Sequence, residues 1–217
     1  MKNTSADVSW VDRVQKRYKE LGILIPPRQE HLYRAMSRTF APGRTVVDIG
    51  CSTGVGTNIL SHGARHVWGV DINEEAIDFA TKAFARPNMN FDVYDIEKPP
   101  TRSHSPFEMV VMSEILEHVE QPELALNNVK RFFHERTKTI GFITCPNQVN
   151  AEVRENEKKH GFHLHKWNAG EFYELMTTHF NAVVMYSAEK VNTWQPSETV
   201  DGSSEDYLIV AKVEGPK

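Results

Sequence analysis

The chain has 217 residues, of which 40% are hydrophobic and 25% are charged, and its formal net charge is -4 at pH 7. This composition is ordinary for a globular protein with one sizeable core. Two cysteines, Cys51 and Cys145, are too few for a disulfide framework and form no Cys-x-x-Cys pair. No apolar run approaches the roughly 18 to 20 residues that span a bilayer, and the first residues lack the apolar core of a signal peptide. We therefore expect a cytoplasmic protein without a membrane partner.

Charge is unevenly distributed along the chain. Residues 1–44 contain nine Lys or Arg and four Asp or Glu, whereas the remainder contains 16 basic and 25 acidic residues. A basic segment could meet an anionic partner, but a charge run more often marks a solvated helix face, which is the interpretation that we favour.

Residues 1–43 contain two amphipathic stretches, 9–21 and 28–39, separated by the helix breaker at residues 25–27. They predict a helical N-terminal extension. From residue 44 onwards, short β-branched or apolar runs alternate with helical patterns. The predicted strands are residues 45–49, 66–70, 89–93, 108–112 and 139–144, and the predicted helices between them are residues 55–61, 74–84 and 122–133. This alternation predicts a parallel sheet with helices on both faces.

The last third of the chain departs from this rhythm. A helix over residues 168–178 is followed by two strands, 182–187 and 207–213, with a polar connection and no helix between them. Such a pair is antiparallel. We therefore expect an α/β fold for residues 44–217: a Rossmann-like three-layer sandwich with a mostly parallel seven-stranded sheet and an antiparallel C-terminal strand. The polar stretch 147–167, which contains three histidines, predicts a partly helical lid or binding loop.

The loop after the first predicted strand, residues 48–54, is the expected binding site, because ligands of open α/β sheets bind beyond the carboxyl ends of the strands. A dinucleotide fingerprint would need glycine where Ser52 and Val55 stand. A hydrolase Gly-x-Ser-x-Gly elbow would make Ser52 a nucleophile, but no earlier strand supplies an oxyanion hole. Both interpretations are therefore disfavoured.

The loop VDIGCSTG, residues 47–54, resembles the first motif of class I S-adenosylmethionine-dependent methyltransferases, although Ser52 replaces the more frequent glycine. Asp71 stands 17 residues after Gly54 at the end of the second strand, and Asp95 follows the third. The resemblance implies S-adenosylmethionine as cofactor, with Asp71 binding the ribose hydroxyls and Asp95 the adenine amino group. The full set of candidate cofactor-binding residues is Asp48, Gly50, Ser52, Gly54, Asp71, Ile72, Asp95, Ile96 and Ser113.

A second group follows the fourth predicted strand. Glu114, Glu117 and His118 stand at i, i+3 and i+4, so one turn of helix would place them on one face. Carboxylate and imidazole donors suit Mg, Mn, Fe or Zn. The segment is similar to the Glu-x-x-Glu-His metal segment of ubiquinone-pathway O-methyltransferases. It also resembles small-RNA 3′-end 2′-O-methyltransferases, and this second resemblance implies His165, or failing it His163, as a fourth ligand.

These patterns predict a methyltransferase that acts on a hydroxyl of a small molecule, with or without the help of a divalent metal. Without a metal, His118, His163 or His165 would be the general base. An RNA 3′-end 2′-hydroxyl is the alternative acceptor, which overall acidity and the absence of a basic tail disfavour. A noncatalytic binding protein with the same fold is a third hypothesis.

Overall fold

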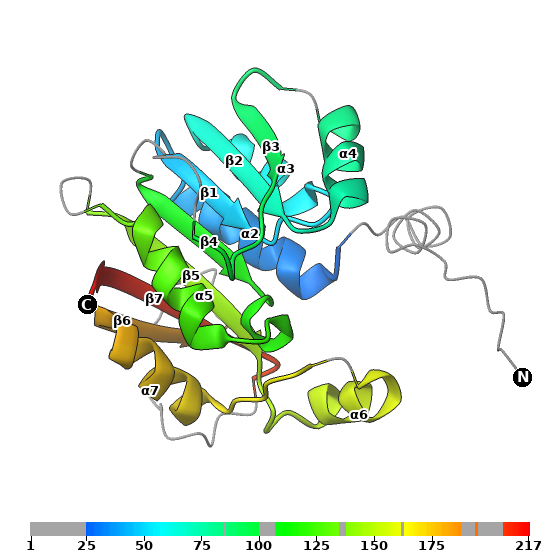
Figure 1. Ribbon diagram of the computed structural model, residues 1–217, viewed down its shortest axis with the longest axis vertical. Coiled ribbons are helices and arrows are strands. Elements are labelled where there is room, and N and C mark those ends of the chain that lie inside the picture. The colour runs from blue at the N-terminus through cyan, green and yellow to red at the C-terminus, as the bar shows by residue number, and fades with distance from the viewer. Residues whose placement is uncertain are drawn as a thin grey trace, which may run out of the picture.

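The computed structural model describes residues 25–84, 86–99, 107–134, 138–161, 163–187, 194 and 206–217 (Figure 1). The predicted helix over residues 9–21 and most of the polar connection over residues 196–206 lie outside these ranges. Among the described helices, none combines the length and the apolar character that crossing a membrane requires.

Seven strands form one sheet with the order β3-β2-β1-β4-β5-β7-β6. The strands are β1 (Thr45–Ile49), β2 (His66–Asp71), β3 (Met89–Val93), β4 (Met109–Ser113), β5 (Ile140–Pro146), β6 (Phe180–Ser187) and β7 (Leu208–Pro216). The first five in the sheet are parallel, and β7 is antiparallel to both β5 and β6. This arrangement confirms the predicted fold class. Strand order reverses between β1 and β4, which is where a ligand is expected.

Helices cover both faces of the sheet (Figure 1). They are α2 (Pro27–Thr39), α3 (Val55–Ser61), α4 (Glu74–Ala83), α5 (Pro122–Val129), α6 (Ala151–His160) and α7 (Ala169–His179), with the short 3-10 helices η1 (Leu116–His118) and η2 (Lys130–Phe132). The side chains of neighbouring strand residues enter opposite cores. Val46 packs in the core under α2 and α3, whereas Val47 packs in the core under α5 and α7. The central strands β4 and β5 are therefore buried along their whole length, whereas the edge strand β3 is mostly exposed.

Most predicted element boundaries agree with the structure to within three residues. The predicted helix 122–133 ends earlier, at Val129, and continues as the 3-10 turn η2. Strand β5 extends to Pro146 because this residue pairs with Leu208 of β7, a partner more than 60 residues away. Helix α2 packs against the sheet, since Leu32 and Met36 are fully buried in the cluster that contains Val46.

Helix α7 ends in a buried histidine. His179 is 6% exposed, and neither ring nitrogen has a hydrogen-bond partner among the described residues. Burial, followed by the charge of Lys130, lowers the pKa of His179, although Glu123 acts in the opposite direction. The folded protein therefore keeps this ring neutral at a pH at which the unfolded chain, with an ordinary pKa of about 6.5, binds a proton.

We predict that this histidine makes the protein less stable as the pH falls below about 6.5, because protons then bind preferentially to the unfolded state. In His179→Leu the loss of unfolding free energy between pH 8.5 and pH 5.5, measured by urea denaturation, should be smaller than in the wild type. A second measurement at pH 8.5, well above the pKa of either state, is the reference from which the loss in each protein is taken. Equal pH dependence in His179→Leu and the wild type would contradict the assignment.

Candidate cofactor and metal sites

The loop between β1 and α3 turns sharply over the end of β2. Gly50 and Gly54 have φ angles of 75° and 78°, and Ser52 has a φ angle of 49°. The N–H groups of Gly50 and Cys51 both donate to the carbonyl oxygen of Val70, at 2.7 and 2.9 Å. The loop is therefore fixed by backbone hydrogen bonds to β2, and Ser52 adopts the left-handed conformation that a glycine would adopt without strain.

Asp48 braces this loop from inside the protein. It is fully buried, and its two carboxylate oxygens accept hydrogen bonds from the Tyr33 hydroxyl at 2.9 Å and the Thr57 hydroxyl at 2.6 Å. Burial raises its pKa to about 6, although both hydrogen bonds act to lower it. Because both oxygens are engaged inside the protein, Asp48 supports the binding loop rather than facing a ligand. No sequence pattern linked Tyr33 of α2 to this loop.

Asp71 and Ile72 lie where β2 ends beside the loop. Asp71 accepts hydrogen bonds from the N–H groups of Ser52, at 2.8 Å, and Asn73, at 2.9 Å. The side chain of Ile72 is 65% exposed, which is unusual for a large aliphatic residue. The carboxylate is thus held in place by the loop itself, and an uncovered apolar surface lies next to it.

Asp95 follows β3 on the same side of the sheet. Its carboxylate accepts a hydrogen bond from the N–H of Glu97 at 3.0 Å and lies 3.0 Å from the Lys98 ammonium. The other two predicted residues are buried: the Ile96 carbonyl accepts from Asn128, and the Ser113 hydroxyl lies 3.0 Å from the Thr144 hydroxyl. Asp71 and Asp95 therefore line the carboxyl edge of the sheet, whereas the side chains of Ile96 and Ser113 are largely covered.

The expectation that Glu114 shares a helical face with Glu117 and His118 is wrong. Only Leu116–His118 form a 3-10 turn, and Glu114 precedes it with a φ angle of 55°. The cause lies in the neighbouring strand, because the N–H of Glu114 donates to both the carbonyl and the hydroxyl oxygen of Thr144 in β5, each at 3.2 Å. Glu114 is thereby kept at the end of the sheet, outside the helical turn.

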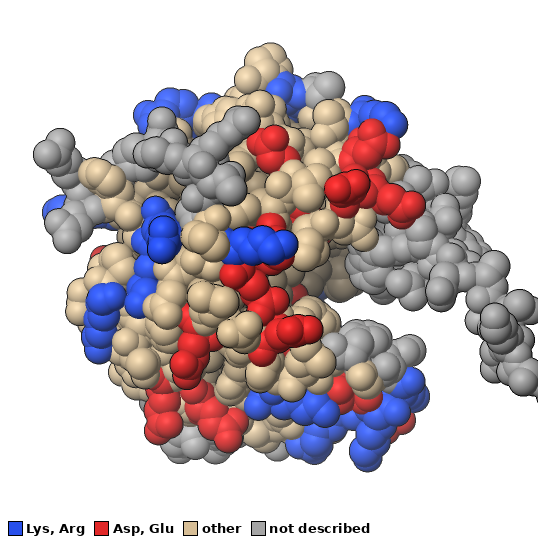
Figure 2. Space-filling model, viewed as in Figure 1, with Lys and Arg blue, Asp and Glu red and all other residues tan. Residues whose placement is uncertain are grey.

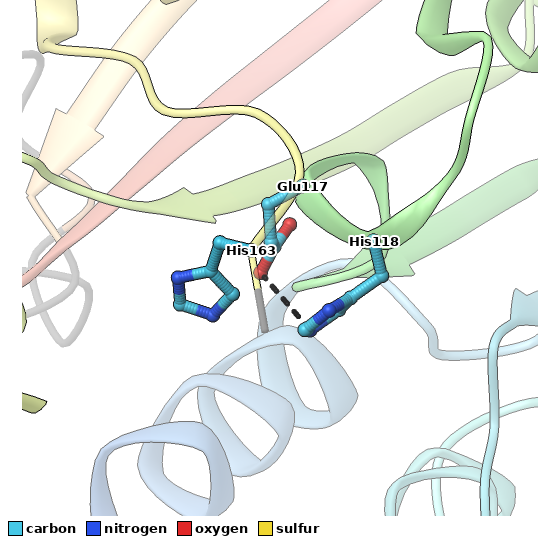
Figure 3. Close-up of side chains that lie close together, drawn as sticks. All are labelled: Glu117, His118 and His163. Atoms are coloured by element: carbon cyan, nitrogen blue, oxygen red, sulfur yellow. Dashed lines mark ion pairs between the residues drawn. The ribbon is translucent and has the colours of Figure 1, made fainter. Parts of the chain in front are cut away.

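Glu117, His118 and His163 instead form a compact group, in which potential ligand atoms of the three side chains all lie within 4.8 Å of one another (Figure 3). The His118 and His163 rings are 4.9 Å apart, and His118 Nε2 lies 4.0 Å from Glu117 Oε1. Two segments meet here because the carbonyl oxygen of Glu117 accepts hydrogen bonds from the N–H groups of Leu164, at 2.8 Å, and His165, at 3.2 Å. The predicted lid segment is thus attached by its backbone to the η1 turn that follows β4.

Glu117 is the most unusual residue of this group. It is 1% exposed, and neither carboxylate oxygen has a hydrogen-bond donor among the described residues. Burial, followed by repulsion from Glu114, raises its pKa well above the ordinary value. A buried carboxylate without donors is costly, and a cation that binds it removes this cost. Two imidazoles beside such a carboxylate fit a divalent transition metal.

His165 and Glu114, two of the four predicted ligands, lie outside this group. The His165 ring stacks on Trp167 with centroids 5.5 Å apart, and its Nε2 lies 3.4 Å from the carbonyl oxygen of Glu120. The structure therefore places His163 next to Glu117 and His118. His163 was the second of the two histidines that the resemblance implied as a ligand, after His165. A residue that the sequence reasoning missed, Glu157 of α6, contacts His163. No motif signalled this contact, because it depends on how α6 folds back.

The two sites are adjacent. A side chain at Gly50 would overlap with Cδ1 and Cγ1 of Ile115, which lies between Glu114 and the η1 turn. The absence of a side chain at Gly50 thus leaves room for Ile115 to pack against the binding loop. The candidate metal-binding group of Glu117, His118 and His163 and the loop after β1 are therefore parts of one region at the carboxyl edge of the sheet.

A family model described as a methyltransferase domain matches residues 41–195. The chain belongs to this family. Membership confirms the resemblance to class I S-adenosylmethionine-dependent methyltransferases. The chain is 29% identical over 114 residues to the ubiquinone biosynthesis O-methyltransferase of Coxiella burnetii. The aligned region covers 52% of this chain and 47% of that protein. The chain spans about half the length of the curated relatives it matches.

Solved structures agree on the fold. A chain in the complex between the Haloferax volcanii Trm112 methyltransferase activator and a methyltransferase has a TM-score of 0.69 at 16% identity, covering 94% of both chains. The N-methyltransferase NodS from Bradyrhizobium japonicum, in complex with S-adenosyl-L-homocysteine, has a TM-score of 0.61 at 17% identity and covers 98% of this chain and 94% of its own. At these identities the similarity establishes a shared methyltransferase fold.

We predict that Gly50→Ala destabilises the protein more than Gly43→Ala does. Both glycines have φ angles above 70°, so each substitution costs about 1 to 2 kcal/mol of backbone strain. Only at Gly50 does the added methyl group also meet Ile115, whereas at Gly43 it meets open space. Thermal unfolding of the two variants isolates the contribution of Ile115, and equal melting temperatures would show that Ile115 is free to move away.

Proposed function

We propose that this protein transfers a methyl group from S-adenosylmethionine to a hydroxyl oxygen of a small molecule, with a divalent metal held by Glu117, His118 and His163. One observation carries the proposal. A buried carboxylate without hydrogen-bond donors lies beside two imidazoles, next to the binding loop of a methyltransferase fold.

The described residues fit the cofactor. The Asp71 carboxylate, preset by the Ser52 N–H, would accept hydrogen bonds from the ribose hydroxyls, and the exposed Ile72 side chain would cover one face of the adenine. Asp95 at the next strand end would accept from the adenine amino group. The glycine-containing loop would lie against the remainder of the cofactor, since its backbone allows close approach at Gly50 and Gly54.

The ligand set narrows the choice of metal. Two imidazoles and one carboxylate suit Zn or Fe better than Mg, which prefers oxygen donors alone. When bound, such an ion would lower the pKa of an acceptor hydroxyl and orient its oxygen. The three side chains would hold the ion by carboxylate and imidazole lone pairs, leaving further coordination positions for the acceptor.

In the transfer itself, a lone pair of the acceptor oxygen forms a bond to the methyl carbon, and the carbon–sulfur bond breaks with its electron pair remaining on sulfur. The hydroxyl proton leaves to solvent. The protein mainly aligns the two reactants. The backbone attachment of the lid to Glu117, together with Ile115 against Gly50, places the acceptor-side residues next to the cofactor loop.

A small-molecule acceptor is favoured over an RNA end. The Coxiella burnetii relative is a ubiquinone biosynthesis O-methyltransferase, which supports a small acceptor. Helix α6, next to the metal group, carries three basic and three acidic residues, so it offers no net positive charge to phosphates. In Figure 2 the face turned to the viewer where α6 lies shows mainly basic side chains with a few acidic ones between them. We assign His165, stacked on Trp167, to anchoring the lid rather than to proton transfer.

The cofactor assignment predicts that the purified protein binds S-adenosylhomocysteine in calorimetry. Asp71→Asn should weaken binding by about tenfold or more, because the neutral amide offers one acceptor fewer than the carboxylate and loses charge-assisted hydrogen bonds. The exposed Asp78 of α4, which pairs with Lys82, provides the matched control, and Asp78→Asn should bind like the wild type. Absence of binding by the wild type would favour a noncatalytic role of the fold.

The metal assignment predicts that Glu117→Gln abolishes tight Zn binding but leaves the metal-free protein at least as stable as the wild type at pH 8. The reason is that the substitution removes a carboxyl group whose ionisation burial disfavours and whose oxygens have no donors among the described residues. Zn titration and urea denaturation measure the two effects, and Glu120→Gln, an exposed neighbour, is the control. A Glu117→Gln variant that binds Zn like the wild type would exclude this site.

A methyl-transfer assay with the same purified proteins identifies the class of acceptor. Transfer of a labelled methyl group should occur to hydroxylated aromatic compounds and decrease with EDTA. Transfer to an RNA oligonucleotide instead would reassign the acceptor. Unchanged turnover in EDTA would remove the metal from the reaction.

A further inference from the structure

Glu157 lies behind the metal-like group, on helix α6 of the lid. Its side chain is 10% exposed, its Oε2 lies 2.8 Å from Nδ1 of His163, and its Oε1 lies 3.1 Å from the ammonium group of Lys166. Burying a glutamate to this extent is unusual unless it is paired. Both of its partners come from the loop that carries the candidate ligand His163.

The end of α6 explains why these groups meet. Gly161 has a φ angle of 59°, and its N–H donates to the carbonyl oxygen of Glu157 at 2.8 Å, which ends the helix with a left-handed residue. The chain then reverses direction, so His163 and Lys166 return alongside the helix that they have just left. Val153, 2% exposed, anchors the other side of α6 in the protein.

We propose that Glu157 is a positioning residue that fixes the ring of His163 through Nδ1, so that Nε2 is the nitrogen available to a metal shared with Glu117 and His118. This inference rests on the metal assignment proposed above. The three candidate ligands lie on the η1 turn and on the loop after α6, and Glu157 adds a carboxylate from α6 itself. Metal binding would therefore be linked to the position of α6.

The chemistry of the pair supports this role. The Glu157 carboxylate lies on the Nδ1 side of the His163 ring, 2.8 Å from that nitrogen. A carboxylate next to Nδ1 favours the form with the proton on Nδ1, which leaves the lone pair on Nε2. The Lys166 ammonium lies 3.1 Å from the other carboxylate oxygen, Oε1, so Glu157 has a cationic neighbour as well as the imidazole.

Outer carboxylates of this kind commonly change metal affinity by 10- to 100-fold. Affinity for Zn should therefore fall by about this factor in Glu157→Gln, because an amide accepts more weakly and can present its NH₂ group to His163. Glu157→Asp, which keeps the charge but shortens the side chain, should give a smaller loss. The matched control is Glu155→Gln, at an exposed glutamate of the same helix that lies 3.5 Å from the Lys159 ammonium. It should not change the affinity for Zn.

The experiment is a Zn titration of the metal-free 217-residue chain and its variants, followed by a Co titration in which visible absorption reports the ligand field. Binding of S-adenosylhomocysteine, which should be equal in all variants, shows that each is folded. A double-mutant cycle separates positioning from a general structural effect: in a His163→Ala background, Glu157→Gln should cause no further loss of Zn affinity.

A second readout follows the lid directly. Arg154, Lys158 and Lys159 are exposed trypsin sites on α6. Zn should slow cleavage there in the wild type but much less in Glu157→Gln, because metal and helix are then no longer linked through His163.

The outcomes are distinguishable. If the wild type binds neither Zn nor Co, the metal assignment itself fails. If the wild type binds Zn and Glu157→Gln binds it equally well, with the same Co spectrum, the positioning role is overturned. A Glu157→Gln loss of the same size with and without His163 would also overturn it, since Glu157 would then act by another route.

Discussion

The carbonyl oxygen of Glu117 accepts two backbone hydrogen bonds from the lid, and the candidate site depends on this attachment. Each such bond contributes only about 1 kcal/mol to stability. Their geometric effect is larger, because they bring Leu164 and His165 over the end of β4 and so place His163 next to Glu117 and His118. A further backbone hydrogen bond, from the N–H of Gln148 to the carbonyl oxygen of Trp167 at 3.0 Å, holds the end of the same segment beside β5.

A second constraint connects this group to the rest of the fold. Gly50 has no side chain, and Ile115 fills the space beside it. On the opposite side, Tyr33 and Thr57 hold the buried Asp48, so helix α2 supports the same loop from below. The carboxyl edge of β1 and β4 is thus held from both sides, which is the rigidity that a reaction requiring in-line alignment of two reactants needs.

The lid differs in character from this rigid edge. Helix α6 has a balanced surface charge and one well-buried apolar anchor, Val153, and its contact with the site passes through Glu157. A bidentate pair between Arg28 of α2 and Glu152 of α6 adds a partly exposed contact at 3.0 and 3.2 Å. Exposed pairs of this kind contribute little, so the buried Glu157–His163 contact is the more important link between lid and site.

The sequence by itself determined the sheet, the binding loop and the strand-end acids, because these depend on hydrophobic periodicity and on short-range turn chemistry. It also selected Glu117 and His118. Only the tertiary structure decided that Glu114 leaves the helical turn and that His163 rather than His165 joins the group. It alone also placed Tyr33 against Asp48 and Glu157 against His163. Those outcomes depend on hydrogen bonds between segments distant in sequence, such as Glu114 with Thr144 and Glu117 with the lid, which no local pattern encodes.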